Sequence, residues 1–215
     1  MLPITEIASQ MGLDPEVVLP YGKYKAKISL DAIRNGGPQG KMILVTAVTP
    51  TRAGEGKTTT TVGLTQALGK LGHSVIATLR EPSLGPIFGI KGGGTGGGVA
   101  LVEPQDEVNV HFTGDAHAVS SAHNLLAALT DNAAQRNKIP GLSPEGISWR
   151  RVSDMEDRAL RSIVTGVGGS NNAPVRETGF DIVTASEIMA ILALSSDLED
   201  LRARLKRIVV ATTKD

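Results

Sequence analysis

The spacing of apolar residues in the first half of the chain predicts strands and a helix in alternation. Residues 42–48 form an unbroken apolar run rich in β-branched side chains, which is typical of a strand buried on both faces of a parallel sheet. Leucine and alanine recur at helical spacing over residues 64–71, and Gly72 favours a helix end directly after them. Residues 75–79 form a second short apolar run. This order predicts an α/β fold with a parallel sheet and helices on both faces.

The pattern in the second half of the chain predicts further elements. Residues 108–112 and the segment that begins at 208–211 have the composition of strands. Residues 149–163 mix polar and apolar positions and predict a helix. Capping-box spacing at 184–187 and at 196–199 predicts that two more helices begin there.

A glycine-containing loop lies between the first predicted strand and its helix. Gly54 and Gly56 allow the backbone to approach an anion closely, and the N–H groups at the start of the helix would point at it. Lys57 would then reach the outer phosphates of a nucleotide, and the Thr58 hydroxyl would ligate magnesium. The general phosphate-loop pattern has glycine where this chain has Thr51. The alternative is an ordinary strand-to-helix turn that needs small residues, but the flanking pattern favours phosphate binding.

Arg80 and Glu81 follow the second predicted strand directly. Ligands of open parallel sheets bind beyond the carboxyl ends of the strands, so Arg80 could stabilise a transferring phosphoryl group. The alternative is a surface ion pair with Glu81. The next segment, residues 85–98, is dense in glycine and predicts a flexible loop over the site, with Lys91 as an anion contact. It contains the letters G-x-G-x-x-G, but no strand leads into it and no helical pattern follows, which argues against a dinucleotide fingerprint.

Two histidines and a carboxylate lie at the next predicted strand-to-helix connection. His111 is in the strand, while Asp115 begins the helix and His117 follows within its first turn. These groups could act as a base, a ligand of metal-bound water or a substrate anchor, or Asp115 could be only a helix cap. His123, further along, is predicted to be structural, and the histidine spacing does not match a zinc site. The predicted buried face of this helix consists of Val119, Ala122, Leu126 and Leu129.

The composition excludes several classes of protein. Lys+Arg and Asp+Glu both number 22, and aromatic residues make up only 3% of the 215, which argues against a nucleic-acid surface. The chain has no cysteine, so disulfides, thiolate catalysis and sulfur-ligated metals are excluded. The amino terminus has no signal-peptide pattern, and no apolar run is long enough to cross a membrane. We therefore expect a soluble, cytoplasmic protein.

Four sequence strings, in this order, resemble formate–tetrahydrofolate ligases, which are also called 10-formyltetrahydrofolate synthetases. The similarity extends from about Tyr21 to the last residue. The strings are Thr49-Pro50-Thr51 through Gly54-Glu55-Gly56-Lys57-Thr58-Thr59-Thr60, then Leu79 to Pro86, His111 to Val119, and Arg176 to Ile182. This resemblance accounts for Thr51, because the phosphate loop of the family is not the general one. Arg52 stands where we expect proline in the family.

The resemblance implies an activity and a site. The family makes 10-formyltetrahydrofolate from formate, ATP and tetrahydrofolate through formyl phosphate. The resemblance implies a P-loop NTPase-like fold in which Lys57 contacts the outer phosphates and Thr58 faces Mg²⁺. It also implies that Arg80 lies at the formyl phosphate, with His111, Asp115 and His117 nearby. The residues implied to hold ATP are Thr51, Arg52, Ala53, Gly54, Glu55, Gly56, Lys57 and Thr58.

The length of the chain departs from the family. Members are much longer than 215 residues, and the part that resembles their folate-stacking aromatic site lies beyond position 215. We therefore expect an amino-terminal nucleotide-binding portion, with a helical arm over residues 1–40 and a P-loop domain over residues 41–215 that is incomplete at its carboxyl end. A monovalent cation and assembly into a homo-oligomer are further expectations from the family.

Two other functions fit parts of the sequence. A ParA-like or MinD-like switch ATPase would account for Gly-Lys-Thr-Thr, and it would hydrolyse ATP without formate. A non-catalytic module that pairs with a full-length ligase would account for the short chain.

Overall fold

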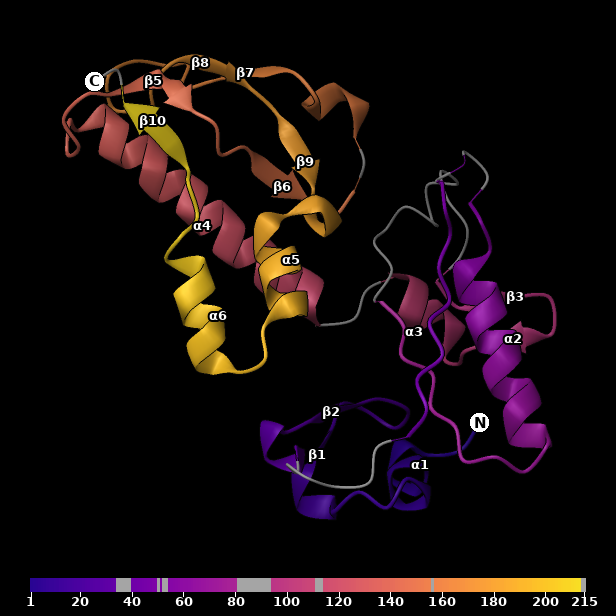
Figure 1. Ribbon diagram of the computed structural model, residues 1–215. Helices are drawn as coiled ribbons and strands as arrows, with labels where there is room; N and C mark the ends of the chain where they lie inside the picture. Colours follow the sequence, from indigo (N-terminus) through magenta and orange to yellow (C-terminus); the bar gives the residue numbers. More distant parts are fainter. Residues whose placement is uncertain are drawn as a thin grey trace. The chain divides into compact units, whose positions relative to one another are not determined.

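The computed structural model describes residues 1–33, 40–49, 51, 54–80, 94–110, 114–155 and 157–213. The chain divides into two compact units, each built from more than one segment. The first comprises Met1–Thr51, Glu55–Ala77 and Thr95–Asp106, and the second comprises Arg52–Gly54, Thr78–Gly94 and Glu107–Asp215. Figure 1 gives the labels of the helices and strands. Within the described residues the fold is mixed α/β, with several helices and small two-stranded sheets.

The first unit combines short helices with two hairpins. Strands β1 and β2 pair antiparallel, with Val18 opposite Ile28, and the glycine-rich pair β3 and β4 is also antiparallel. The predicted helix around residues 64–71 is confirmed as α2, and Gly72 follows its carboxyl end with a left-handed φ of 85°. The elements are α1 (Ile4–Gln10), the 3-10 turns η1 (Pro15–Val17) and η2 (Leu30–Ala32), β1 (Val18–Pro20), β2 (Ala26–Ile28), α2 (Lys57–Lys70), β3 (Gly96–Gly97) and β4 (Ala100–Leu101); α3 (Gln105–Val110) begins in this unit.

The two segments predicted as the first sheet strands are not paired strands in the described structure. Residues 42–48 and 75–79 have no ladder partner among the described residues, so neither satisfies the hydrogen-bonding condition for a strand. Their apolar side chains are correspondingly open to solvent, with Met42 90% and Ile76 65% exposed. The part of the chain that the structure describes therefore does not confirm the expected parallel sheet at these two segments.

The second unit packs three small sheets and two shorter helices around a long helix, α4 (Asp115–Gln135). Strands β6 and β9 pair in parallel, with Arg151 opposite Phe180, whereas the other two pairs are antiparallel. The strands are β5 (Leu142–Ile147), β6 (Arg151–Ser153), β7 (Ile163–Thr165), β8 (Arg176–Thr178), β9 (Phe180–Ile182) and β10 (Ala211–Thr213). The remaining elements are η3 (Arg158–Leu160), η4 (Val183–Ala185), α5 (Glu187–Leu194) and α6 (Leu198–Leu205).

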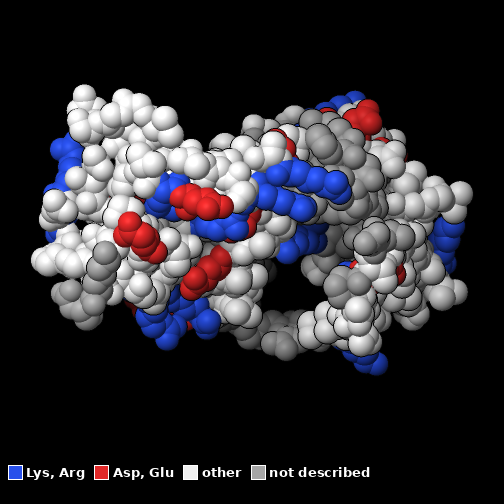
Figure 2. All heavy atoms as spheres, turned by 90° about the horizontal axis from the view of Figure 1, so that it is seen from above, with Lys and Arg blue, Asp and Glu red and all other residues white. Residues whose placement is uncertain are grey.

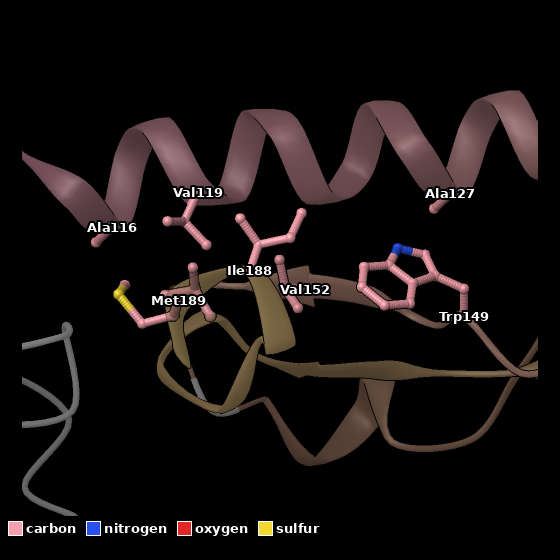
Figure 3. Packing of buried hydrophobic residues seen from close by; sticks show 8 residues of the cluster. Ala116, Val119, Ala127, Trp149, Val152, Ile188 and Met189 are labelled. Atoms are coloured by element: carbon pink, nitrogen blue, oxygen red, sulfur yellow. The ribbon is translucent and has the colours of Figure 1, made fainter. Parts of the chain in front are cut away.

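One face of α4 provides much of the core of the second unit. Figure 3 shows Ala116, Val119 and Ala127 on the helix above Ile188 and other apolar side chains from β6 and α5. The predicted buried face was correct at Val119 and, in part, at Leu126, which packs against the core, whereas Ala122 and Leu129 are exposed. The face that is buried instead carries Ala116, Val119, His123, Ala127, Thr130, Asp131 and Ala134.

Several predicted elements differ from the structure. The expected strand at 108–112 is wrong at its start, because residues 108–110 belong to helix α3. The expected helix at 149–163 is wrong, because β6, η3 and the first residue of β7 occupy that segment. Strand β6 is stabilised by pairing with β9, which is remote in sequence and leaves no local signal at residues 151–153.

The helix starts predicted near residues 184–187 and 196–199 are confirmed, although the capping residues differ. Ser186 caps α5 by accepting the Ile188 N–H at 3.1 Å, and Asp197 caps α6 by accepting the Asp200 N–H at 2.8 Å. Asp14 caps the single 3-10 turn η1 within the expected helical arm, and its carboxylate accepts the Glu16 N–H at 3.0 Å.

Charges on the surface are mixed. The face drawn in Figure 2 shows Lys and Arg side chains next to Asp and Glu side chains. Among the described helices, none has the length and apolar character needed to cross a membrane.

Candidate functional site

The loop before α2 contains two glycines in the left-handed region. The φ angles of Gly54 and Gly56 are 80° and 72°, values that strongly favour glycine over residues with a Cβ. An added Cβ would meet no atom within 4 Å at either position, so the backbone conformation rather than crowding requires glycine. Arg52 and Ala53, also predicted to contact ATP, lie outside the described residues.

Helix α2 begins at Lys57 without a side-chain cap. Its N-cap is Gly56, which has no side chain to accept a hydrogen bond, and the first intrahelical bond runs from the Thr60 N–H to the Gly56 carbonyl at 2.8 Å. The N–H groups of the first helical turn have no intrahelical acceptor. They lie at the positive end of the macrodipole of a 14-residue helix, which favours an anion there.

Glu55 and Lys57 form an ion pair at the mouth of this loop. The Glu55 carboxylate also accepts the backbone N–H of Thr51, so one carboxylate contacts two groups predicted to bind ATP. The hydrogen bond from Lys57 and then that from Thr51 lower the pKa of Glu55 below its usual range. A phosphate group at this loop would therefore have to compete with the Glu55 carboxylate for Lys57.

The threonines of α2 differ in their hydrogen bonding. Thr61 donates its hydroxyl hydrogen to the Lys57 carbonyl, and Thr65 donates to the Thr61 carbonyl, both at 2.8 Å. The Thr58 hydroxyl, in contrast, has no hydrogen-bond partner among the described residues. Its oxygen is therefore not committed to the helix backbone and can serve as a ligand.

The hairpin of β3 and β4 holds α2 in place. Val62 on α2 is 3% exposed, and the Gln66 side-chain amide donates to the Leu101 carbonyl at 3.1 Å. A Cβ on Gly96 would lie 2.2 Å from the Ala100 carbonyl oxygen, so the hairpin requires glycine there. The glycine-rich stretch 85–98 thus supplies part of a packed hairpin, a role that its composition did not reveal. Its remaining residues 85–93, including Lys91, lie outside the described residues, as does Glu81.

Arg80 is exposed and bonded within the second unit. Its guanidinium donates to the Thr184 carbonyl at 2.8 Å, which holds the side chain beside η4. The suggested partner Glu81 falls outside the described residues, so the alternative of an ion pair between them stays a prediction.

Asp115 and His117 lie in the first turn of α4. The Asp115 carboxylate accepts the N–H of Ala116 at 2.8 Å, and His117 is exposed two residues later. His111 lies outside the described residues, so the proximity predicted for the three groups stays a prediction. In the part of the chain that the structure describes, no three His, Asp or Glu side chains gather as metal ligands.

His123 has the structural role predicted for it. The side chain is buried against the Trp149 ring, with ring centroids 4.2 Å apart. One ring nitrogen lies 2.8 Å from the Ser186 hydroxyl and the other 2.8 Å from the Arg150 carbonyl oxygen. These contacts fit a neutral imidazole that donates to the carbonyl and accepts from the serine.

The burial of His123 predicts a pH dependence of stability. Desolvation lowers the pKa of His123 below its ordinary value of 6.5, while the Arg150 carbonyl opposes this effect. The unfolded chain therefore binds a proton more readily than the folded chain, so this contribution to stability is present above pH 6.5 and is lost as the pH falls below it. We expect the thermal midpoint to fall on acidification more steeply in the wild type than in His123→Gln. Equal slopes in scans between neutral and mildly acidic pH would contradict this role.

A buried ionic cluster was not predicted from the sequence. The Asp131 side chain on α4 is 4% exposed and lies 3.0 Å from an Arg176 nitrogen and 2.9 Å from an Arg151 nitrogen. The Arg176 side chain is also buried, with 7% of its surface exposed. A buried aspartate needs a positively charged side chain nearby in the folded protein. Here both arginines belong to strands that are remote in sequence from Asp131, so the pattern around Asp131 does not indicate them.

The chain is similar to a family of known proteins over its whole length. The family model described as formate–tetrahydrofolate ligase matches residues 1–215. Proteins named formate–tetrahydrofolate ligase from Bartonella tribocorum and Oenococcus oeni are each 58% identical, over 99% and 98% of this chain. A protein of the same name from Desulforamulus reducens is 55% identical over 100% of it. The chain spans 38% of the length of each of these relatives.

Proposed function

The chain belongs to the formate–tetrahydrofolate ligase family, and from this premise we propose that it carries the ATP and formyl phosphate part of an enzyme that joins formate to tetrahydrofolate. The proposal rests most directly on one observation. Helix α2 begins without a side-chain cap directly after two left-handed glycines, and its first residue is Lys57. A triphosphate could accept hydrogen bonds from the N–H groups of the first turn, which have no intrahelical acceptor. The helix dipole and the Lys57 ammonium would add favourable positive charge.

The proposed reaction has two steps. A formate oxygen attacks the γ-phosphorus of ATP, the bond from this phosphorus to the β,γ-bridging oxygen breaks, and ADP leaves. The amine at N10 of tetrahydrofolate then attacks the carbon of formyl phosphate, the bond from carbon to the phosphate oxygen breaks, and the nitrogen loses a proton. The products are 10-formyltetrahydrofolate and phosphate, so the reaction belongs to the ATP-dependent carbon–nitrogen ligases.

In the first step the loop at residues 51–58 holds the triphosphate. Backbone N–H groups at the start of α2 would donate to phosphate oxygens, and the Lys57 ammonium would leave Glu55 to contact the outer phosphates. Formate is a weak nucleophile, so the rate depends on stabilising negative charge on the transferring group and on the departing ADP oxygen. The Lys57 ammonium and the backbone N–H groups at the start of α2 would supply that stabilisation. Because the fold already holds these N–H groups in place, little reorganisation is needed during the reaction.

The Thr58 side chain suits magnesium. Its hydroxyl oxygen is a hard ligand and has no hydrogen-bond partner among the described residues. Magnesium usually takes one or two protein oxygens and completes its shell with phosphate oxygens and water, so a single threonine hydroxyl from the protein suits this mode. When bound, the ion would offset charge on the phosphate oxygens. A monovalent cation is a further proposal from the family.

Four residues are proposed to act on the acyl phosphate. Arg80 would exchange its hydrogen bond to the Thr184 carbonyl for one to the transferring phosphoryl group. His111, Asp115 and His117 are proposed to line the same site, where a carboxylate and imidazoles can orient formate or accept a proton. The loop at residues 85–98 is proposed to keep water from the formyl phosphate.

A P-loop NTPase-like parallel sheet remains our proposal for the fold around this site. Residues 42–48 and 75–79 flank α2, are strongly apolar and have exposed side chains such as Met42 and Val48. Exposed apolar runs of this kind are typical of surfaces that another part of a protein covers. Pairing of these two runs as neighbouring strands would bury them and place the loop at the carboxyl edge of the sheet.

Replacement of Arg80 tests the proposed chemistry. We expect Arg80→Ala to lower the rate of formate-dependent ADP formation by about 10²–10³-fold, because a cation that faces the transferring phosphoryl group is lost. The affinity for ATP should change by less than about threefold, since Lys57 and the loop amides remain. Arg207→Ala removes an exposed arginine elsewhere on the same chain and should leave the rate unchanged.

Trapping formyl phosphate with hydroxylamine while ADP is measured separates this function from a switch ATPase. The proposal requires ADP and formyl hydroxamate to form in equal amounts and only with formate. Hydrolysis of ATP that proceeds equally well without formate would instead support the ParA-like or MinD-like alternative.

A further inference from the structure

A polar groove lies at the carboxyl end of α4, and none of its lining residues is among those assigned to ATP in the sequence. Its volume is about 540 Å³, within the range of small-molecule sites, and its lining includes Asp131, Arg136 and Arg151. The other polar lining comes mainly from side-chain amides, those of Asn132, Gln135, Asn171 and Asn172. We call this the α4 groove.

The floor of the α4 groove is a fixed ionic cluster. Asp131 is 4% exposed, and each of its carboxylate oxygens lies within 3.0 Å of a different guanidinium, those of Arg176 and Arg151. Arg176 is 7% exposed, whereas Arg151 is 24% exposed and lines the groove. Arg176 donates two hydrogen bonds to one carboxylate oxygen, whereas the contact of Arg151 with the other oxygen is an ion pair without hydrogen-bond geometry. The two arginines carry one positive charge more than the single carboxylate neutralises.

The walls of the groove are tied together by hydrogen bonds. The Gln135 amide on α4 donates to the Ser170 carbonyl at 2.8 Å, and the Asn172 amide donates to the Val167 carbonyl at 2.7 Å. The Gln135 bond connects the end of α4 to the loop between β7 and β8 (Figure 1), and the Asn172 bond lies within that loop. A Cβ on Gly166 would lie 2.3 Å from the Ala173 carbonyl oxygen, so the chain closes tightly here. Specific contacts within this unit therefore hold the groove in shape.

The charge of the groove favours an anion. Its charged lining residues are Asp131, Arg136 and Arg151, so their net charge is +1, and Arg176 behind them adds another positive charge. Within the described residues the Arg136 guanidinium has no ion-pair or hydrogen-bond partner. Arg136 also lies at the C-cap of α4, where a cation offsets the helix dipole, but that role needs no cavity beside it.

We propose that the α4 groove binds a small organic anion through a phosphate or carboxylate group held by Arg136 and Arg151. The planar guanidinium of arginine matches both groups with paired hydrogen bonds. The surrounding amides offer donors and acceptors to the rest of the ligand. The residues of this site are not those assigned to ATP, so the proposal does not depend on their function.

Titration calorimetry with inorganic phosphate and with succinate tests the proposal. The titrations use the full chain carrying Lys57→Ala, which weakens phosphate binding at the loop before α2. We expect saturable binding of at least one probe with a Kd in the millimolar range or below, corresponding to about −4 kcal/mol. Tighter binding of phosphate would identify a phosphorylated ligand, and tighter binding of succinate would identify a carboxylate.

Two further variants locate that binding. Arg136→Gln in the same background should weaken it about fivefold to tenfold, because one charged donor is lost. Lys138→Gln removes the same charge two residues away, outside the groove lining, and should change the affinity by less than about twofold. No saturable binding of either probe up to about 10 mM, or equal weakening by both variants, would overturn the proposal.

Discussion

Lys57→Ala is expected to lower kcat/KM for ATP by about 10²–10³-fold and to remove measurable ATP binding at micromolar concentrations. Lys57 is the first residue of α2, and its ammonium is paired with Glu55 in the loop that precedes the helix. Its removal takes away a charge-assisted contact to the outer phosphates in both the ground state and the transition state. Calorimetry with ATP and Mg²⁺ measures the loss of binding, and ADP formation measures the loss of rate.

Two control variants separate the charge of Lys57 from the structure around it. Lys70→Ala removes an exposed lysine from the other end of the same helix and should leave ATP binding intact. Glu55→Gln breaks the same ion pair but keeps the ammonium, so ATP should bind at least as tightly as to the wild type. Unchanged affinity in Lys57→Ala, or an equal loss in Glu55→Gln, would count against phosphate binding at this loop.

Asp131→Ala is expected to destabilise the second unit by about 3–5 kcal/mol, because it leaves the Arg176 and Arg151 guanidiniums without their shared carboxylate. Arg176 is 7% exposed, so water cannot replace the lost partner fully. Denaturant unfolding followed by the fluorescence of Trp149 measures the effect, since this residue is the only tryptophan and belongs to the core of the unit.

Arg204→Ala is the matched control for the loss of an ion pair. Arg204 pairs with Asp200 one turn earlier on α6, and both side chains are about one third exposed. We expect a loss below about 0.5 kcal/mol, as is typical of solvent-exposed pairs on a helix. Losses of the same size in the two variants would mean that burial of Asp131 adds nothing to its importance.

The local chemistry of the sequence predicted α2 and the glycine loop before it, although the strand predicted at residues 42–48 has no ladder partner among the described residues. Gly54 and Gly56 have the left-handed conformation that only glycine adopts easily, and α2 starts at Lys57 and ends before Gly72. These features depend on residues close in sequence, so their signal is contained in a short window. Binding of ATP at this loop stays a prediction that rests on the geometry and on the family.

The buried face of α4 shows why other features were missed. The prediction followed the leucines, but the buried polar residues His123, Thr130 and Asp131 lie on the face that packs. Each has a partner: Ser186 for His123, the Leu126 carbonyl at 2.8 Å for Thr130, and two arginines for Asp131. A polar group is tolerated in a buried position only when it has a hydrogen-bond or ion-pair partner. The partners of His123 and Asp131 are side chains remote in sequence, so the local pattern does not indicate them. Strand β6 was missed for the same reason, because its partner β9 follows a long intervening segment.

Hydrogen exchange at single backbone amides, measured with and without ATP and Mg²⁺, tests the central claim most directly. If the triphosphate binds at the start of α2, the amides of Gly56, Lys57, Thr58 and Thr59 should exchange more slowly when the nucleotide is present. The same amides in Lys57→Ala should show little change. Protection that leaves these four amides unaffected, in a wild-type protein shown to bind ATP, would place the nucleotide elsewhere and contradict the account.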